Sequence, residues 1–419
     1  MRVLLLGSGA KDHAIAWWFS QSRFISALYV APGNLATASI AENLPDLDPT
    51  DKEAVYSACQ KLSIDFVFIG TEAPLFTGVI KYLNERGIST FGATEEATKL
   101  EGDKIFSRAF FARHRVPCPV SAFFKTLRDL DTHLQERKGQ TFVIKSSRVA
   151  PSRIMLTSSD RHALLDFASS LFPMGPVLLE ENLTGISASC TLFLDGDHYI
   201  LLPITGDYTT KGTDDTTPTG GMGAICPVPV IEKLKNKIVK NIIEPVLEGM
   251  KQENLMYKGV LTLSLVITTD GPYLVDIHVR FNDPATQAMV PLITTDLVDI
   301  MNAMKEGRLN EVELQTSQQI ALAVVLASEG YPLAPVTGRE IKGLTCPFLL
   351  PLKDHPVIFC GALQRAEHAA VTTGGRNITV VGVADTLSEA NRKAYEVIKQ
   401  KNFEGLWYRE DIGNSYLTI

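Results

Sequence analysis

Three chemically useful side chains alternate in one segment of the second half of the chain. Asp276, His278 and Arg280 are each two positions apart, and alternate residues of a β-strand face the same way. Such a strand could aim two metal ligands and a phosphate-binding guanidinium at one point. A half-buried structural strand alternates in the same way, so the spacing alone leaves both interpretations open.

A lysine ends the apolar segment at 141–145, which predicts a buried strand. The ammonium group of Lys145 would be costly to bury unless it met an anion, and the oxygens of a triphosphate would supply one. The more common fate of a lysine is to extend along the surface into water. Lys145 is therefore either a phosphate-binding residue or an ordinary surface residue.

Two glycine-rich segments could bind an anion through the backbone. Gly7-Ser8-Gly9-Ala10 separates a predicted strand from a predicted helix, and free amide groups at such a corner can bind a phosphate. Thr219-Gly220-Gly221-Met222-Gly223-Ala224 lets the backbone approach a substrate closely. Purely structural turns would also use glycine. Asp12 replaces the third glycine of a dinucleotide fingerprint, so we do not expect a nicotinamide site.

The pattern of apolar runs and turns around these residues predicts a mixed α/β and α+β protein of three domains. Apolar runs ending in glycine turns alternate with helical spacing early in the chain, which predicts an open parallel sheet at 1–103. Hairpin turns at 195–197 and 269–271 predict an α+β domain at 104–328, with a smaller lobe at about 121–190. Strands and one clear helix predict a mainly antiparallel domain at 329–419.

Composition restricts the class of function. The 419 residues include 40 basic and 47 acidic side chains, giving a net charge of −7, so no basic field attracts nucleic acid. Six cysteines are scattered singly, which is typical of reduced thiols in a cytoplasmic protein. No apolar run has the length of a membrane span. We expect a cytoplasmic protein that has neither nucleic acid nor a membrane as a partner.

The short motifs, in their order along the chain, resemble those of phosphoribosylamine glycine ligases, which are ATP-grasp enzymes of purine synthesis. Residues 219–224 match the family's T-G-G-M-G-A in full. Other segments resemble family motifs less completely: 7–14 (G-x-G-G-R-E-H-A), 101–104 (E-G-S-K), 144–145 (I-K), 180–183 (E-E-F-L) and 276–287 (E-F-N-x-R-F-G-D-P-E-T-Q).

The resemblance implies an ATP-dependent ligase that joins glycine to 5-phosphoribosylamine through an acyl phosphate. It implies ATP with Mg²⁺ or Mn²⁺ as cofactors and glycine and phosphoribosylamine as small-molecule partners, and we expect a monomer or homodimer. The candidate catalytic residues are Arg280 and Lys145, and the candidate metal ligands are Asp276 and His278. The candidates for ATP binding are Lys104, Lys145, Glu180, Glu181 and Leu183. The candidates for substrate binding are Gly9, Asn34, Glu72, Gly220, Gly221, Met222 and Asp283.

The chain departs from the family pattern on the nucleotide and metal side. The family's glycine-rich stretch after I-K is replaced by residues 146–155, which contain no glycine, and the carboxylates that follow the hinge are missing at 184–189. Asp276 and His278 replace Glu and Asn, and imidazole favours softer metals than Mg²⁺. Two alternatives therefore stay open: a non-catalytic relative that binds a ligand or partner, and a ligase with a changed substrate or nucleotide.

Overall fold

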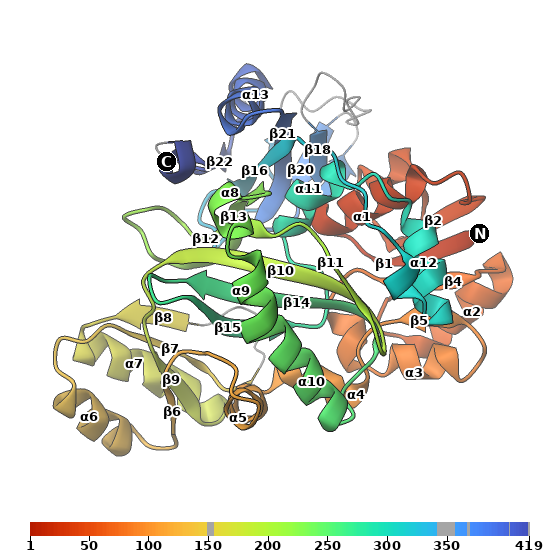
Figure 1. The fold of residues 1–419 in the computed structure, drawn as a ribbon. Coiled ribbons are helices and arrows are strands. Elements are labelled where there is room, and N and C mark those ends of the chain that lie inside the picture. The colour runs from red at the N-terminus through yellow and green to blue at the C-terminus, as the bar shows by residue number, and fades with distance from the viewer. Residues whose placement is uncertain (149–154, 342–356, 367–368, 402, 418–419) are drawn as a thin grey trace.

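The computed structural model describes residues 1–148, 155–341, 357–366, 369–401 and 403–417, and its ribbon is drawn in Figure 1. The elements predicted from the sequence are confirmed: a parallel sheet first, an ATP-grasp-like middle and antiparallel strands last. The thiols of Cys59, Cys118, Cys190 and Cys226 are free. No helix among these residues is long and apolar enough to cross a membrane.

The first hundred residues form a parallel sheet with the strand order β3-β2-β1-β4-β5. Side chains of the central strand alternate between two cores, with Val3 and Leu5 packed on one face and Leu4 and Leu6 on the other. Helix α1 covers the first face, while α2 and α3 cover the second. The elements are β1 (Arg2–Gly7), α1 (Ala10–Ser20), β2 (Ala27–Pro32), β3 (Glu42–Asn43), α2 (Lys52–Leu62), β4 (Phe66–Ile69), α3 (Val79–Asn84) and β5 (Ser89–Phe91).

Two helices lead from this sheet into a small antiparallel lobe, which projects from the molecule in Figure 1. Its sheet has the order β6-β9-β7-β8, and its helices enclose a separate apolar core. The connecting helices are α4 (Glu95–Gly102) and α5 (Lys104–Arg113). The lobe consists of β6 (Ser121–Phe124), α6 (Leu127–Glu136), β7 (Phe142–Ser146), β8 (Met155–Ser158), α7 (Arg161–Leu171) and β9 (Val177–Glu181).

A large sheet with the order β15-β14-β10-β12-β13-β16-β21-β18 forms the centre of the molecule. Its strands are β10 (Ile186–Asp195), β12 (Thr205–Thr210), β13 (Pro218–Cys226), β14 (Lys258–Ile267), β15 (Pro272–His278), β16 (Ile320–Ser328), β18 (Val357–Cys360) and β21 (Arg376–Ala384). Two short strands extend it, β11 (Tyr199–Leu201) beside β10 and β22 (Leu406–Trp407) beside β16. Strand β16 pairs with β13 on one side and β21 on the other, so the last part of the chain continues the central sheet.

The remaining elements cover this sheet or extend the last part of the chain. A three-stranded sheet joins β17 (Glu340–Ile341), β20 (Ala369–Thr372) and β19 (Leu363–Ala366). The helices are α8 (Pro229–Glu232), α9 (Lys235–Ile238), α10 (Glu244–Gln252), α11 (Ala285–Met289), α12 (Leu297–Glu306), α13 (Leu387–Lys401) and α14 (Asn414–Leu417). The loops at the carboxyl ends of β1 and β4 face those after β15, and the site lies where they meet.

Candidate functional site

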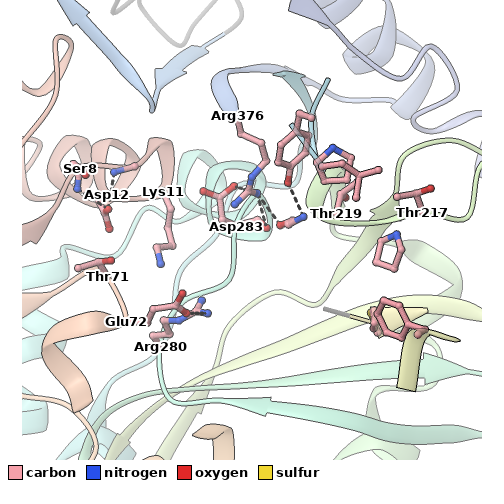
Figure 2. A pocket seen from close by; sticks show the side chains of 18 residues that line it. Ser8, Lys11, Asp12, Thr71, Glu72, Thr217, Thr219, Arg280, Asp283 and Arg376 are labelled. Carbon is pink, nitrogen blue, oxygen red and sulfur yellow. Dashed lines mark hydrogen bonds and ion pairs between the residues drawn. The ribbon is translucent and has the colours of Figure 1, made fainter. Parts of the chain in front are cut away.

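A cavity of about 650 Å³ lies where loops from all parts of the chain converge. Figure 2 shows its side chains pointing inward from α1, from the loop after β4, from the segment after β15 and from β13 and β21. Its polar lining comprises Ser8, Lys11, Asp12, Thr71, Glu72, Thr217, Thr219, Arg280, Asp283, Tyr331 and Arg376. The cavity therefore contains both signs of charge.

Lys104 and Asp276 face each other across the boundary between α5 and β15. The Nζ atom of Lys104 lies 2.5 Å from Oδ1 of Asp276 and also donates to the carbonyl oxygen of Glu101 at 3.2 Å. Burial opposes ionisation of Asp276, but the ammonium groups of Lys104 and Lys145 outweigh burial and hold its pKa far below the ordinary value. Burial lowers the pKa of Lys104, and Asp276 partly offsets that effect. The predicted phosphate-binding lysine and the predicted metal ligand thus form one ion pair.

Glu180 joins Lys145 to a residue that the sequence did not suggest, Arg108. Oε2 of Glu180 lies 2.6 Å from Nζ of Lys145, and Nε of Arg108 donates to Oε1 at 2.5 Å. The side chain of Glu180 is 3% exposed. Burial raises its pKa, but the two cations outweigh burial and leave the pKa below its usual value. Arg108 lies four residues after Lys104 and so on the same face of α5, and this spacing could have identified it.

Glu101 organises the predicted catalytic arginine. Its Oε1 atom lies 3.0 Å from Nη2 of Arg280 and 3.0 Å from Nδ1 of His278, and its Oε2 accepts the backbone N–H of Val279 at 2.9 Å. Arg280 also forms an ion pair with Glu72. Burial opposes ionisation of Glu101, but Arg280 and His278 hold its pKa well below the ordinary value. Glu101 belongs to the motif at 101–104, but no feature of that motif singled out its side chain.

The glycine-rich run in β13 packs against the segment after β15. The hydroxyl of Tyr331 accepts the N–H of Gly220 at 2.7 Å, and Nη1 of Arg376 donates to the carbonyl of Gly220 at 2.7 Å and to Oδ1 of Asp283 at 2.8 Å. Gly221 has φ of +108°, and a Cβ there would lie 2.7 Å from the carbonyl oxygen of Asp283. Close packing requires glycine at this junction.

The backbone amides at the start of α1 are already occupied by the chain itself. Oδ2 of Asp12 accepts the N–H groups of Ser8 at 2.9 Å and Gly9 at 2.8 Å. The side-chain amide of Asn34 donates to the carbonyl oxygens of Ser8 and Cys360, each at 2.8 Å. In this conformation the carboxylate of Asp12 therefore takes the position in which a substrate anion was expected.

The structure pairs Lys104 with Asp276 and Lys145 with Glu180, and it groups His278, Arg280 and Glu72 around Glu101. Gly220 and Asp283 lie at the adjoining junction. Other predicted residues lie outside these contacts. Met222 is fully buried against Val325 and Ala327, while Glu181 and Leu183 are half-buried at the end of β9. Residues 149–154 of the glycine-poor stretch, with Arg153, lie outside the described residues.

Few side chains near Asp276 are placed to act as ligands of a metal ion. No group of three or more His, Cys, Asp or Glu side chains in the described ranges is placed to hold a metal ion. His278 is directed at Glu101. This leaves Asp276 as a single carboxylate, which fits Mg²⁺ bound by one protein carboxylate and by the phosphates of a substrate.

A small antiparallel lobe, a larger sheet and buried lysines between them define an ATP-grasp protein. The model of the phosphoribosylglycinamide synthetase ATP-grasp domain matches residues 102–286, and those of the N and C domains of the same enzyme match 1–101 and 321–415. The chain belongs to the phosphoribosylglycinamide synthetase family.

Similar proteins support this assignment over nearly the whole length. The phosphoribosylamine–glycine ligases of Rhodopirellula baltica and Salmonella typhi are 33% and 34% identical, each over 99% of this chain and 98% of the relative. The ligase structure from Thermotoga maritima has a TM-score of 0.81 at 29% identity and covers 98% of this chain and 100% of that one. A biotin carboxylase domain from Hydrogenobacter thermophilus has a TM-score of 0.73 at 13% identity, covers 97% of this chain and 91% of that one, and shows only the shared fold. These full-length matches to ligases do not favour a non-catalytic binding relative.

Proposed function

We infer that this protein joins glycine to 5-phosphoribosylamine at the expense of ATP, giving glycinamide ribonucleotide. One structural observation carries the proposal: the ammonium groups of Lys104 in α5 and Lys145 in β7 both act on Asp276 of β15, where the small lobe meets the large sheet. Buried cations at such a boundary suit the negative charge of a triphosphate. The family relationship identifies the reaction that this arrangement serves.

The reaction has two steps. A carboxylate oxygen of glycine attacks the γ-phosphorus of ATP, the bond to the β-phosphate oxygen breaks, and ADP leaves behind an acyl phosphate. The amine of phosphoribosylamine then attacks the acyl carbon, phosphate leaves, and the nitrogen loses a proton as the amide forms. The protein positions the reactants and neutralises charge, and no protein nucleophile is needed.

Lys104 and Lys145 act by exchanging their carboxylate partners for the phosphates of ATP. In the described conformation their ammonium groups contact Asp276 and Glu180, and the phosphates of ATP take over part of these contacts when the nucleotide binds. Asp276 would hold Mg²⁺, which would supply charge neutralisation for the phosphates, and His278 would join Asp276 only after leaving Glu101. Arg280 stabilises the transferred phosphoryl group.

The remaining predicted residues bind the other parts of the reactants. Glu181 and Leu183, at the end of β9, bind the adenine. The junction at Gly220, Gly221 and Asp283 binds glycine and the sugar together with Asn34. The amide of Gly9 contributes once Asp12 has released it.

The test is ADP release by the purified protein with ATP, Mg²⁺, glycine and freshly generated phosphoribosylamine. We expect ADP formation that needs both glycine and the sugar amine, and at least a 100-fold loss in Lys145→Met, because an ammonium–phosphate contact made in the transition state is worth several kcal/mol. Lys125→Met, which changes an exposed lysine of the same lobe, is the matched control. ADP release that ignores glycine, in folded protein, would contradict the proposal.

A further inference from the structure

Lys11 is a buried cation without a carboxylate partner. It lies in the first turn of α1, is 7% exposed and lines the cavity. Its Nζ atom donates one hydrogen bond, to the carbonyl oxygen of Phe281 at 3.2 Å. An ammonium group has three donors, and within the part of the chain that the structure describes no carboxylate forms an ion pair with this one.

The carboxylates around Lys11 are engaged elsewhere. Oδ2 of Asp12 accepts the amides of Ser8 and Gly9, while its Oδ1 is buried without a hydrogen-bond partner among the described residues. Glu72 pairs with Arg280, and Asp283 pairs with Arg376. Figure 2 shows the side chain of Lys11 reaching from α1 toward Arg280 and Glu72. The cavity thus contains an ammonium group that the protein has not neutralised by direct contact.

Three physical effects oppose a positive charge at this position. Burial is the largest, and the neighbouring guanidinium of Arg280 adds to it, so that the pKa of Lys11 is lowered. The positive end of the α1 dipole also disfavours a cation in the first turn. A residue that only stabilised the fold would be replaced at little cost by an apolar side chain of similar length. A bound anion would offset all three effects through its attraction to the ammonium group.

We propose that Lys11, together with Arg280, binds an oxyanion of a substrate in this cavity. The shared chemistry is that of the carboxylate of glycine and the 5-phosphate of the sugar amine, either of which would satisfy the two free ammonium donors. The buried Nε of Arg280 also has no hydrogen-bond partner among the described residues, so the neighbouring cation has a free donor as well. This inference rests on the proposed ligase function and assigns a role to a residue that the motif comparison did not select.

The decisive variants are Lys11→Met, which keeps the length of the stem and removes the charge, and Lys11→Arg, which keeps the charge. Lys61→Met, at an exposed lysine of α2, is the control. In ligand-free protein we expect Lys11→Met to raise the melting temperature, because it removes a buried charge without an ion-pair partner. In the ligase assay we expect Lys11→Met to raise the KM of one substrate roughly 10- to 100-fold, the usual effect of losing a hydrogen bond to a charged group. Lys11→Arg should recover most of that loss.

The kinetics distinguish the two sources of the anion. A rise confined to the KM of glycine assigns the carboxylate, and a rise confined to the KM of phosphoribosylamine assigns the phosphate. A lower melting temperature for Lys11→Met with both KM values and kcat unchanged would overturn the proposal and make Lys11 a structural residue.

Anion binding can also be measured without turnover. Millimolar inorganic phosphate or glycine should raise the melting temperature of the wild-type protein and fail to do so in Lys11→Met. Because this readout does not need catalysis, it separates failure of the anion site from failure of the ligase function. Equal stabilisation of both proteins by phosphate and by glycine would exclude Lys11 as the receptor.

Discussion

The proposed nucleotide side and the glycine-rich junction of this site are built in opposite ways. On the nucleotide side, charged side chains meet other charged side chains, as in the pairs Lys104–Asp276 and Lys145–Glu180. At the junction, Gly220 and Gly221 bring the backbone against Asp283 and Arg376 with no room for a side chain. The first region can exchange partners, whereas the second is fixed by close packing. A site that must admit and release a charged nucleotide needs the first kind of construction, and one that shapes a small substrate needs the second.

The largest loss of stability is expected when Glu180, the most buried carboxylate among these charged contacts, is neutralised. Glu180→Gln keeps the shape but leaves Arg108 and Lys145 without their anion. We expect the free energy of unfolding to fall by about 3–5 kcal/mol, as for other buried pairs that lose one partner. Urea denaturation followed by circular dichroism measures it. Glu181→Gln, at the half-buried neighbour, is the control for stability, and equal losses in the two variants would contradict a special role for Glu180.

The network at Glu180 also shows why sequence reasoning reached only part of the site. Lys104, Lys145, Asp276 and Arg280 were found because motif order and strand alternation mark them. The spacing of four residues from Lys104 places Arg108 on the same helix face, but its contact with Glu180 and the role of Glu101 depend on which helix packs beside β15, a tertiary fact that no local period encodes. The strands, the main helices and the sequence of sheets followed from apolar runs and turn residues, since these patterns are local.

The second largest loss of stability is expected for Gly221→Ala, which tests whether the glycine-rich junction can accept a side chain. Gly221→Ala would force an alanine into a left-handed conformation and against Pro284 and Asp283. We expect a loss of about 2–4 kcal/mol, the sum of backbone strain and overpacking, measured by urea denaturation.

Gly196→Ala is the matched control for Gly221→Ala. Its φ of +106° is nearly the same, but open space surrounds it, so only the backbone strain of about 1–2 kcal/mol should appear. Equal losses at the two glycines would show that the junction tolerates a side chain.

A third effect concerns the contact between α1 and β18. The buried ring of His13 accepts the N–H of Cys360 at 3.1 Å, and burial lowers its pKa to about 3. Between pH 6.5 and 3 the unfolded chain binds a proton at this histidine and the folded chain does not, so stability falls as the pH falls. The slope is about 1.4 kcal/mol per pH unit.

His13→Asn keeps an acceptor for the N–H of Cys360 but removes this titration. The difference between the variant and the wild type should therefore shrink from pH 6.5 to pH 4.5. The carboxylates with depressed pKa values lose their contribution only below their unfolded value of about 4, outside this window. Parallel pH profiles of thermal stability for the two proteins would contradict the assignment.

The smallest effect on stability is expected at His278, whose replacement tests whether the ring belongs to the charged contacts around Glu101 or to the metal site. His278→Asn should cost about 1 kcal/mol, because one hydrogen bond to Glu101 is weakened. The ratio of Mg²⁺-supported to Mn²⁺-supported ligase activity should stay unchanged if the ring keeps its contact with Glu101. A marked rise in that ratio would instead assign the imidazole to the metal.

Strand β16 joins the middle and the last part of the chain in one sheet, so the protein is hard to divide there. Both of its edges are paired, one with β13 and the other with β21, and all but one of its side chains are buried. A truncation after residue 328 would leave a long apolar strand with an open edge, which is a template for aggregation. The chain therefore cannot be cut into independently stable pieces at this point, and complementation by separately expressed fragments would require both halves to assemble before either is soluble.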